Sequence, residues 1–177
     1  IWIKRNVIAH NAMAALGCMG EGKTKENYEA ADIPEPIYFI NNTVVGNTYG
    51  ITGGDNLLAL NNIFLNVKRS ALKGVDGRSA AAYNLFWGNG VDFEESNVDR
   101  EHTFRADPML DEQFRPKKGS PCIDAGTSQF VWRFVTGLQP DTNSGSGSLL
   151  IQGWSFYKLE PEDYSGSAPD LGAFELE

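Results

Sequence analysis

Two groups of ionisable residues have the types and spacing that could support catalysis. Asp92 and Glu94 are separated by one residue, so in a β-strand both side chains would face the same side, about 6.6 Å apart. Carboxylates about 5 to 10 Å apart can together hydrolyse a glycosidic bond. Lys73, with Lys68 and Arg69 shortly before it, could bind an anionic group or accept a proton. Ordinary surface charge is the alternative interpretation of both groups.

Two oxygen-rich turns are candidates for calcium binding. The stretch DTNSGSG (141–147) places Asp141 and Asn143 at alternate positions, as oxygen-ligand loops do, but Gln152 stands where a closing glutamate is expected. We interpret this stretch as a Ser/Gly linker. Asp55, which follows ITGG, could belong to a metal site or to an ordinary GGDN turn. Calcium is therefore a candidate cofactor, with Asp55 as the candidate metal ligand.

The composition predicts one domain built from short strands. The chain has 177 residues, of which 41% are hydrophobic and 21% charged, and it carries 19 glycines and 8 prolines without a long amphipathic pattern. The net charge of −8 argues against binding to a nucleic-acid backbone or an anionic membrane. The sequence contains no run of 18 apolar residues, so we expect no membrane span. The two cysteines, Cys18 and Cys122, are interpreted as free thiols rather than a disulfide.

A repeat centred on asparagine indicates the elements that position these residues. Four segments align: IWIKRNVIAHN (1–11), IYFINNTVVGN (37–47), LLALNNIFLNV (57–67) and AAAYNLFWGN (80–89). Their shared asparagines are Asn6, Asn42, Asn62 and Asn84, and the polar insertion 20–36 explains the one long gap. A period of about 20 residues with two or three short strands predicts a solenoid, here a parallel β-helix. We expect the asparagines to form a structural ladder at a left-handed corner.

A further strand in each repeat should form one face of the stack. The segments are LGCM (16–19), ITGG (51–54), LKGV (72–75) and VDFE (91–94). Alternation predicts an inward row of Leu16, Ile51, Leu72 and Val91. It predicts two outward rows, namely Gly17, Thr52, Lys73 and Asp92, and then Met19, Gly54, Val75 and Glu94. This partly polar, glycine-rich face is the predicted floor of a ligand groove, although a register slip of one residue would reverse it.

The second part of the chain departs from the repeat. Residues 1–95 are predicted to form the coils of the β-helix, and residues 96–177 a last coil, a capping segment and a side loop. Exposed solenoid ends aggregate, so a returning C-terminal segment over the last coil is expected. The stretch 128–167, aromatic at both ends, is predicted to be a loop or short hairpin docked on the side of the solenoid.

The chain resembles the C-terminal part of bacterial right-handed parallel β-helix repeat proteins, the pectate-lyase-like superfamily. The resemblance is carried by INNTVVGN, LNNIFLN and YNLFWGN, followed by ADPML, GSPCIDAG and PDLGAFE. It implies a right-handed all-β solenoid with a C-terminal cap, further coils before residue 1, and secretion or display at the cell surface. It also implies a polysaccharide ligand along an outward strand face.

Within that resemblance, two functions are expected. The first is a polysaccharide lyase acting on uronate-containing glycans, with Lys73 as base or carboxylate anchor, assisted by Lys68 and Arg69. Substrate contacts would then come from the following residues: Thr52, Asp92, Glu94 and Trp87. The competing expectation is a non-catalytic surface or adhesion module that binds glycan or acts as a rigid spacer, because the superfamily also contains surface proteins without known activity.

Overall fold

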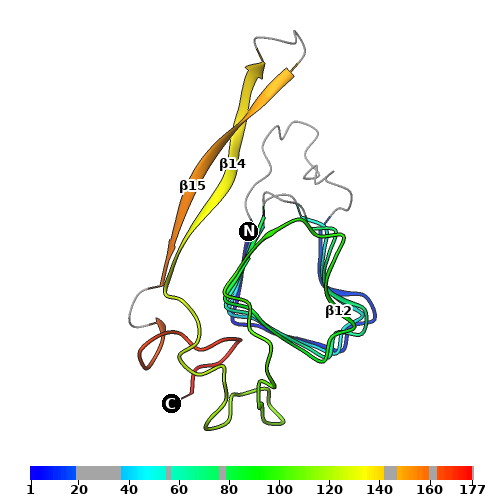
Figure 1. Cartoon of the computed structure of the whole chain (residues 1–177), viewed down its shortest axis with the longest axis vertical. Coiled ribbons are helices and arrows are strands. Elements are labelled where there is room, and N and C mark those ends of the chain that lie inside the picture. Colours follow the sequence, from blue (N-terminus) through cyan, green and yellow to red (C-terminus); the bar gives the residue numbers. More distant parts are fainter. Residues whose placement is uncertain (19–36, 55–56, 76–78, 142–146, 160–162, 177) are drawn as a thin grey trace.

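The computed structural model describes all residues except 19–36, 55–56, 76–78, 142–146, 160–162 and 177. The described residues are all-β, without an α-helix among them, and none of their segments is a helix long enough and apolar enough to cross a membrane. The chain winds through three strands per coil, and equivalent strands stack in three parallel sheets, which we call A, B and C (Figure 1). The predicted stacking of parallel strands is confirmed, and it is consistent with a β-solenoid.

The strands follow the repeat. Sheet A contains β1 (Trp2–Lys4), β4 (Ile37–Ile40), β7 (Leu57–Leu60), β10 (Ala80–Ala82) and β13 (Asp99–Glu101). Sheet B contains β2 (Val7–Ala9), β5 (Thr43–Val45), β8 (Ile63–Leu65) and β11 (Leu85–Trp87). Sheet C contains β3 (Ala14–Gly17), β6 (Tyr49–Thr52), β9 (Ser70–Lys73) and β12 (Val91–Glu94). Because β13 pairs with β10 and Phe104 bridges to Leu85, a partial fifth coil follows β12.

The centre of the coils is filled by stacked apolar side chains. Phe39, Phe64 and Phe86 lie in successive coils, with ring centroids 6.5 Å and 5.2 Å apart, and all three are buried. Each strand alone is too short to bury a face, so burial depends on apolar side chains of successive coils lying one above another, as Val44, Phe64 and Phe86 do in register in sheet B. The repeat period therefore determines the core directly.

One predicted row is wrong in its last member. Leu16, Ile51 and Leu72 pair in register as expected, but Leu72 continues to Phe93 rather than to Val91. Phe93 packs 5.1 Å from Phe86, measured between ring centroids, whereas Val91 is 49% exposed. The register of β12 thus differs by two residues from the predicted alignment, and the larger aromatic side chain fills the core.

The asparagine ladder runs along the corner between sheets A and B. The amides of Asn6, Asn42 and Asn62 each donate from Nδ2 to Oδ1 of the next ladder asparagine, the last acceptor being Asn84, over 2.9 to 3.2 Å. The ladder asparagines do not adopt the expected left-handed conformation. It belongs to the preceding residue of each coil, with φ between 51° and 56°, at Arg5, Asn41, Asn61 and Tyr83.

The doubled asparagines in INN and LNN therefore have two separate functions. Asn42 and Asn62 form the ladder, whereas Asn41 and Asn61 turn the corner. The amides of the corner residues also fasten the C-terminal region, since Asn41 donates to the carbonyl of Asp170 and Asn61 to that of Thr127, both at 2.9 Å.

Two of the three sheets are covered on their outer faces. Tyr157, Leu159 and Phe130 pack on the outer face of sheet A. They lie at the base of a long antiparallel hairpin, β14 (Gln129–Asp141) and β15 (Gly147–Lys158), which extends away from the coils (Figure 1). The base of the hairpin thus packs on the side of the coils, and its paired strands are longer than the expected loop or short hairpin.

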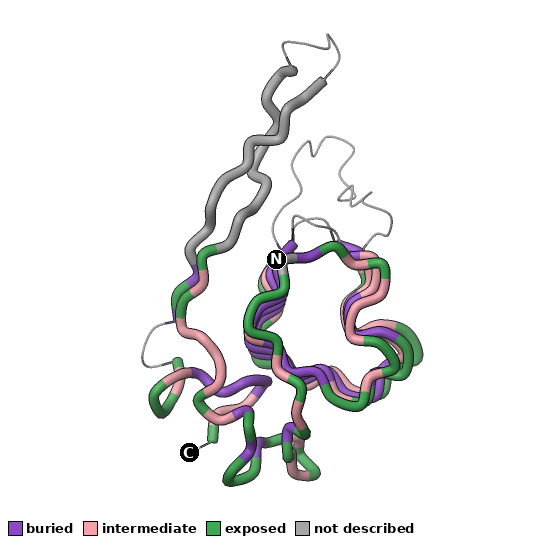
Figure 2. Tube along the Cα trace, in the orientation of Figure 1, coloured by how far each residue is buried: buried purple, intermediate pink, exposed green. Residues whose placement is uncertain are grey.

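The C-terminal region packs on the flank of sheet B. Cys122 and Leu171 form a buried cluster with Ile63 and Leu85 of that sheet, and Figure 2 shows this region beneath the coils. These contacts lie along the side of the stack, and the cap over the last coil stays a prediction. Sheet C has no described element on its outer face.

Candidate functional site

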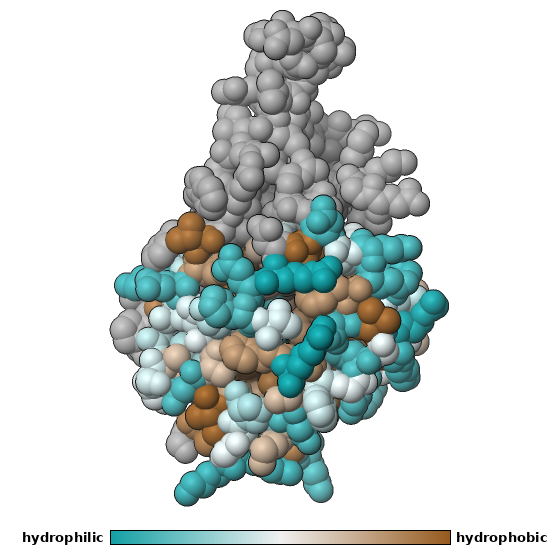
Figure 3. Space-filling model, viewed as in Figure 1, coloured by the Kyte–Doolittle hydropathy of each residue, from teal (hydrophilic) through white to brown (hydrophobic). Residues whose placement is uncertain are grey.

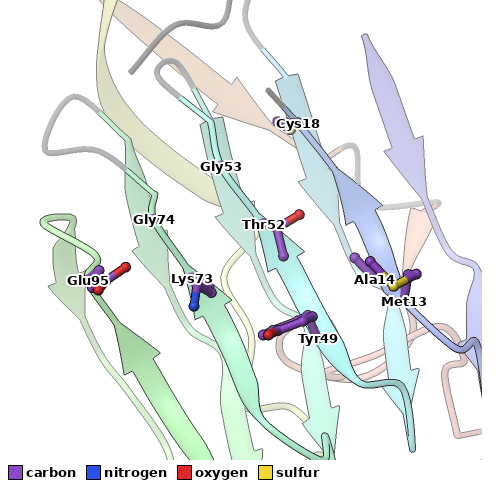
Figure 4. Close-up of a pocket in the computed structure, with 9 residues that line it drawn as sticks. All are labelled: Met13, Ala14, Cys18, Tyr49, Thr52, Gly53, Lys73, Gly74 and Glu95. Carbon is purple, nitrogen blue, oxygen red and sulfur yellow. The ribbon is translucent and has the colours of Figure 1, made fainter. Parts of the chain in front are cut away.

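An open groove lies on the outer face of sheet C (Figure 4). Its volume is about 410 Å³. The lining residues come from successive coils: Met13, Ala14, Cys18, Tyr49, Thr52, Gly53, Lys73, Gly74 and Glu95. Thr52 and Lys73 pair in register on adjacent strands, so their side chains lie side by side on the surface.

The turn that follows sheet C shapes one end of the groove. Gly53, Gly74 and Glu95 occupy equivalent positions in successive coils and all have left-handed backbones, with φ of 71°, 62° and 48°. Two glycines keep the groove open at this end, because they place no side chain above the sheet. Glu95 adds a carboxylate at the third of these positions.

Lys73 is held by a carboxylate. Its Nζ lies 2.7 Å from Oε1 of Glu94, and Ser70 donates its hydroxyl to the other oxygen of the same carboxylate. The hydrogen bond with Glu94 raises the pKa of Lys73 above its ordinary value. The same bond lowers the pKa of Glu94. Both groups are therefore charged at neutral pH, and Lys73 is a donor rather than a proton acceptor.

Tyr49 places an aromatic ring among these charges. The Lys73 Nζ lies 5.6 Å from the ring centroid of Tyr49, and the Arg69 guanidinium carbon lies 5.5 Å from it. These distances fit cation–π contacts. The groove therefore offers an aromatic surface, hydroxyl groups, an ammonium group and a carboxylate, a mixture that can hydrogen-bond a hydroxyl-rich ligand.

The two carboxylates predicted as a possible hydrolytic pair have different hydrogen-bond partners. Glu94 faces Lys73, while Asp92 accepts hydrogen bonds from Arg105 at 2.9 Å and from Asn89 at 3.1 Å. Each carboxylate is thus held by different partners. Asp92 does not line the groove.

The other predicted site residues are distributed around the solenoid. Lys68 and Arg69 are exposed in the turn before β9. Trp87 is 43% exposed at the end of β11, which belongs to sheet B and not to the groove face. Asp55 lies outside the described residues, as does most of the stretch 141–147. Among the side chains that the structure describes, no cluster of three or more His, Cys, Asp or Glu could hold a metal ion. Cys18 and Cys122 form no disulfide, as predicted.

Sequence reasoning missed Tyr49, Ser70 and Glu95. Tyr49 and Ser70 open their strands in the same row, three residues before Thr52 and Lys73, so a longer alignment of the strand would have found them. Glu95 follows the last aligned segment, and its place in the groove could be predicted only from the conformation of the turn after sheet C.

Neither a protein-family model, nor a curated protein, nor a solved structure matches this chain.

Proposed function

We propose that the chain is part of a right-handed parallel β-helix of the pectate-lyase-like superfamily that binds polysaccharide along sheet C. The protein would be secreted or displayed at the cell surface, with the C-terminal region closing the last coil. Stacked parallel sheets and the ordered motifs of the repeat and C-terminal region support this proposal.

The observation that carries the proposal is the groove itself. It lies on the one sheet whose outer face no described element covers, and it runs across several coils. An extended polymer needs such an open surface with repeated positions, because successive sugar units meet equivalent strands. Tyr49, Thr52 and Lys73 supply the ring and polar groups that fix a sugar in place.

An eliminating lyase is the second candidate. Lys73 lines the groove and could anchor the carboxylate of a uronate. The pKa of Lys73, raised by Glu94, favours this anchoring over proton abstraction. A base would have to come from another residue, so the binding function is the better supported of the two.

Substitution of Tyr49 tests the proposed site. We expect Tyr49→Ala to weaken binding to a panel of immobilised polysaccharides by about tenfold, the effect of losing one stacking contact of roughly 1 kcal/mol or more. Trp87→Ala is the matched control, since it removes an exposed aromatic side chain from sheet B. Loss of binding in Trp87→Ala with normal binding in Tyr49→Ala would indicate a site on sheet B and contradict a site on sheet C.

The same panel separates binding from elimination. Wild-type protein is incubated with each polymer, with and without calcium, and the ultraviolet absorbance of unsaturated products is followed. We expect binding without such products. A rise in absorbance that disappears in Lys73→Ala would establish the lyase instead.

A further inference from the structure

The charges around the groove are arranged in opposite pairs. Lys73 is bound by Glu94 at 2.7 Å. The Glu95 carboxylate lines the same groove and interacts electrostatically with Lys73. Arg69 lies over Tyr49 and favours the charged form of Glu94. Two cations are therefore matched by two carboxylates, and the groove carries no local excess of positive charge.

This balance has a consequence for ligands that carry carboxylates. A uronate approaching Lys73 must compete with Glu94 and also meets the negative charge of Glu95. Beyond the groove, the whole chain carries a net charge of −8, which repels a polyanion at low ionic strength. A carboxylate ligand would thus contact Lys73, whose charge Glu94 already neutralises, and would be repelled both by Glu95 and by the net negative charge of the chain.

A hydroxyl group meets the opposite situation. Each hydroxyl both donates and accepts hydrogen bonds, so it can use the ammonium group of Lys73, the carboxylate of Glu95 and the hydroxyl of Thr52 without adding charge. Both signs of the paired groups are then useful to one ligand. The Tyr49 ring offers an apolar surface in the same groove.

We propose that the groove on sheet C selects neutral, hydroxyl-rich glycans and rejects polyuronates. This inference rests on the proposed polysaccharide-binding function and specifies its ligand. The carboxylates of Glu94 and Glu95 are the specificity-determining groups: Glu94 neutralises Lys73, and Glu95 adds repulsion inside the groove.

The test compares two probes of equal length by isothermal titration calorimetry at low ionic strength. The first probe is a series of neutral hexose oligosaccharides, and the second is a series of oligogalacturonates. The variant Glu94→Gln, Glu95→Gln removes both negative charges with little change of shape. We expect it to bind oligogalacturonate about fivefold more tightly than wild type, an effect that added salt should abolish.

The matched control is Glu101→Gln, Glu112→Gln. Both of these residues are exposed and neither lines the groove, so the control changes the net charge equally without touching Lys73. We expect the affinity of this control for oligogalacturonate to rise by less than twofold. Glu95→Gln alone preserves the Lys73–Glu94 ion pair and serves as the second variant if the double variant unfolds. Its affinity for oligogalacturonate should rise by about twofold to fivefold, between the control and the double variant.

The outcomes distinguish this inference from the function on which it rests. Wild type that binds oligogalacturonate as tightly as neutral oligosaccharides overturns the inference but supports a polysaccharide site. Equal gains in the groove and control variants also overturn it, because net charge would then explain the effect. Binding of neither probe series, with unchanged results in every variant, overturns the proposed function and the inference with it.

Discussion

Asn62 is a buried polar side chain whose hydrogen bonds all lie inside the stack. Its Nδ2 donates to the carbonyl of Phe39 at 2.8 Å and to Asn84, while its Oδ1 accepts from the backbone and side-chain amides of Asn42. These bonds satisfy backbone groups that turn inward at the corner and would otherwise be buried without partners. The ladder is therefore required by the corner, and its side chains are held away from any ligand.

We expect Asn62→Ala to lower the free energy of unfolding by about 3 kcal/mol, because it leaves the carbonyl of Phe39 and the amide of Asn42 unpaired in the interior. Asn6→Ala is the matched control. Asn6 occupies the same ladder but is exposed, so water replaces its bonds and the loss should stay below about 1 kcal/mol. Urea denaturation measures both, and equal losses would contradict a buried ladder.

The asparagine spacing was sufficient to predict the ladder positions, because period and residue type are both visible in the sequence. The pairing of Lys73 with Glu94 was not predictable in the same way. It depends on the length of the corner before β12, where the three residues 88–90 replace the four residues 66–69 of the preceding coil. The register of β12 therefore differs by two residues from the predicted one, and Phe93 lies in the core. Such a shift preserves the alternation of strand faces, so the hydrophobic pattern alone does not reveal it.

At the scale of elements, the described side chains at the base of the hairpin attach it to the coils. Tyr157 and Leu159 are buried against Leu58 and Ala80 on the outer face of sheet A. The aromatic ends of the stretch 128–167 favoured docking of this kind. Its long paired strands were not expected, since the Ser/Gly stretch suggested a linker and the antiparallel register depends on the hairpin as a whole.

The hydroxyl of Tyr157 gives a test of this docking. The side chain is 5% exposed, and among the described side chains this hydroxyl is buried without a hydrogen-bond partner. We expect Tyr157→Phe to raise the free energy of unfolding by about 1 kcal/mol, because it removes an unsatisfied polar group and keeps the ring. Tyr157→Ala should instead lower it by about 3 kcal/mol. A thermal unfolding curve in which Tyr157→Phe is less stable than wild type would show that the hydroxyl is bonded.

At the scale of the whole molecule, polar residues connect the C-terminal region to the coils. Figure 3 shows many hydrophilic side chains on one face of the molecule, with scattered apolar ones. At the flank, Asp170 accepts from the backbone amides of Asp124 and Leu176, and Glu175 accepts from that of Asp170 and lies 3.8 Å from Arg5. These carboxylates join segments distant in sequence, so their ionisation affects how firmly the region is attached.

Stability should therefore rise as the solution is acidified from neutral pH. Burial raises the pKa of Asp170 and of Glu175 above the ordinary values of 3.8 and 4.5. The folded chain consequently takes up protons at a higher pH than the unfolded chain, and the resulting stability is lost as pH increases through the folded pKa values. Asp124 acts oppositely at lower pH, because the backbone amide of Ala168 lowers its pKa.

Urea denaturation at a series of pH values measures this dependence. We expect the free energy of unfolding to pass through a maximum on the acid side of neutrality. It should fall at lower pH, where Asp124 and Glu94, whose pKa values are lowered in the folded chain, become protonated. Glu175→Gln should flatten the rise, since it removes one of the two groups and keeps an oxygen that accepts from the amide of Asp170. A steady decrease from neutral pH, equal in both proteins, would show that these carboxylates are not the groups that control attachment of the C-terminal region.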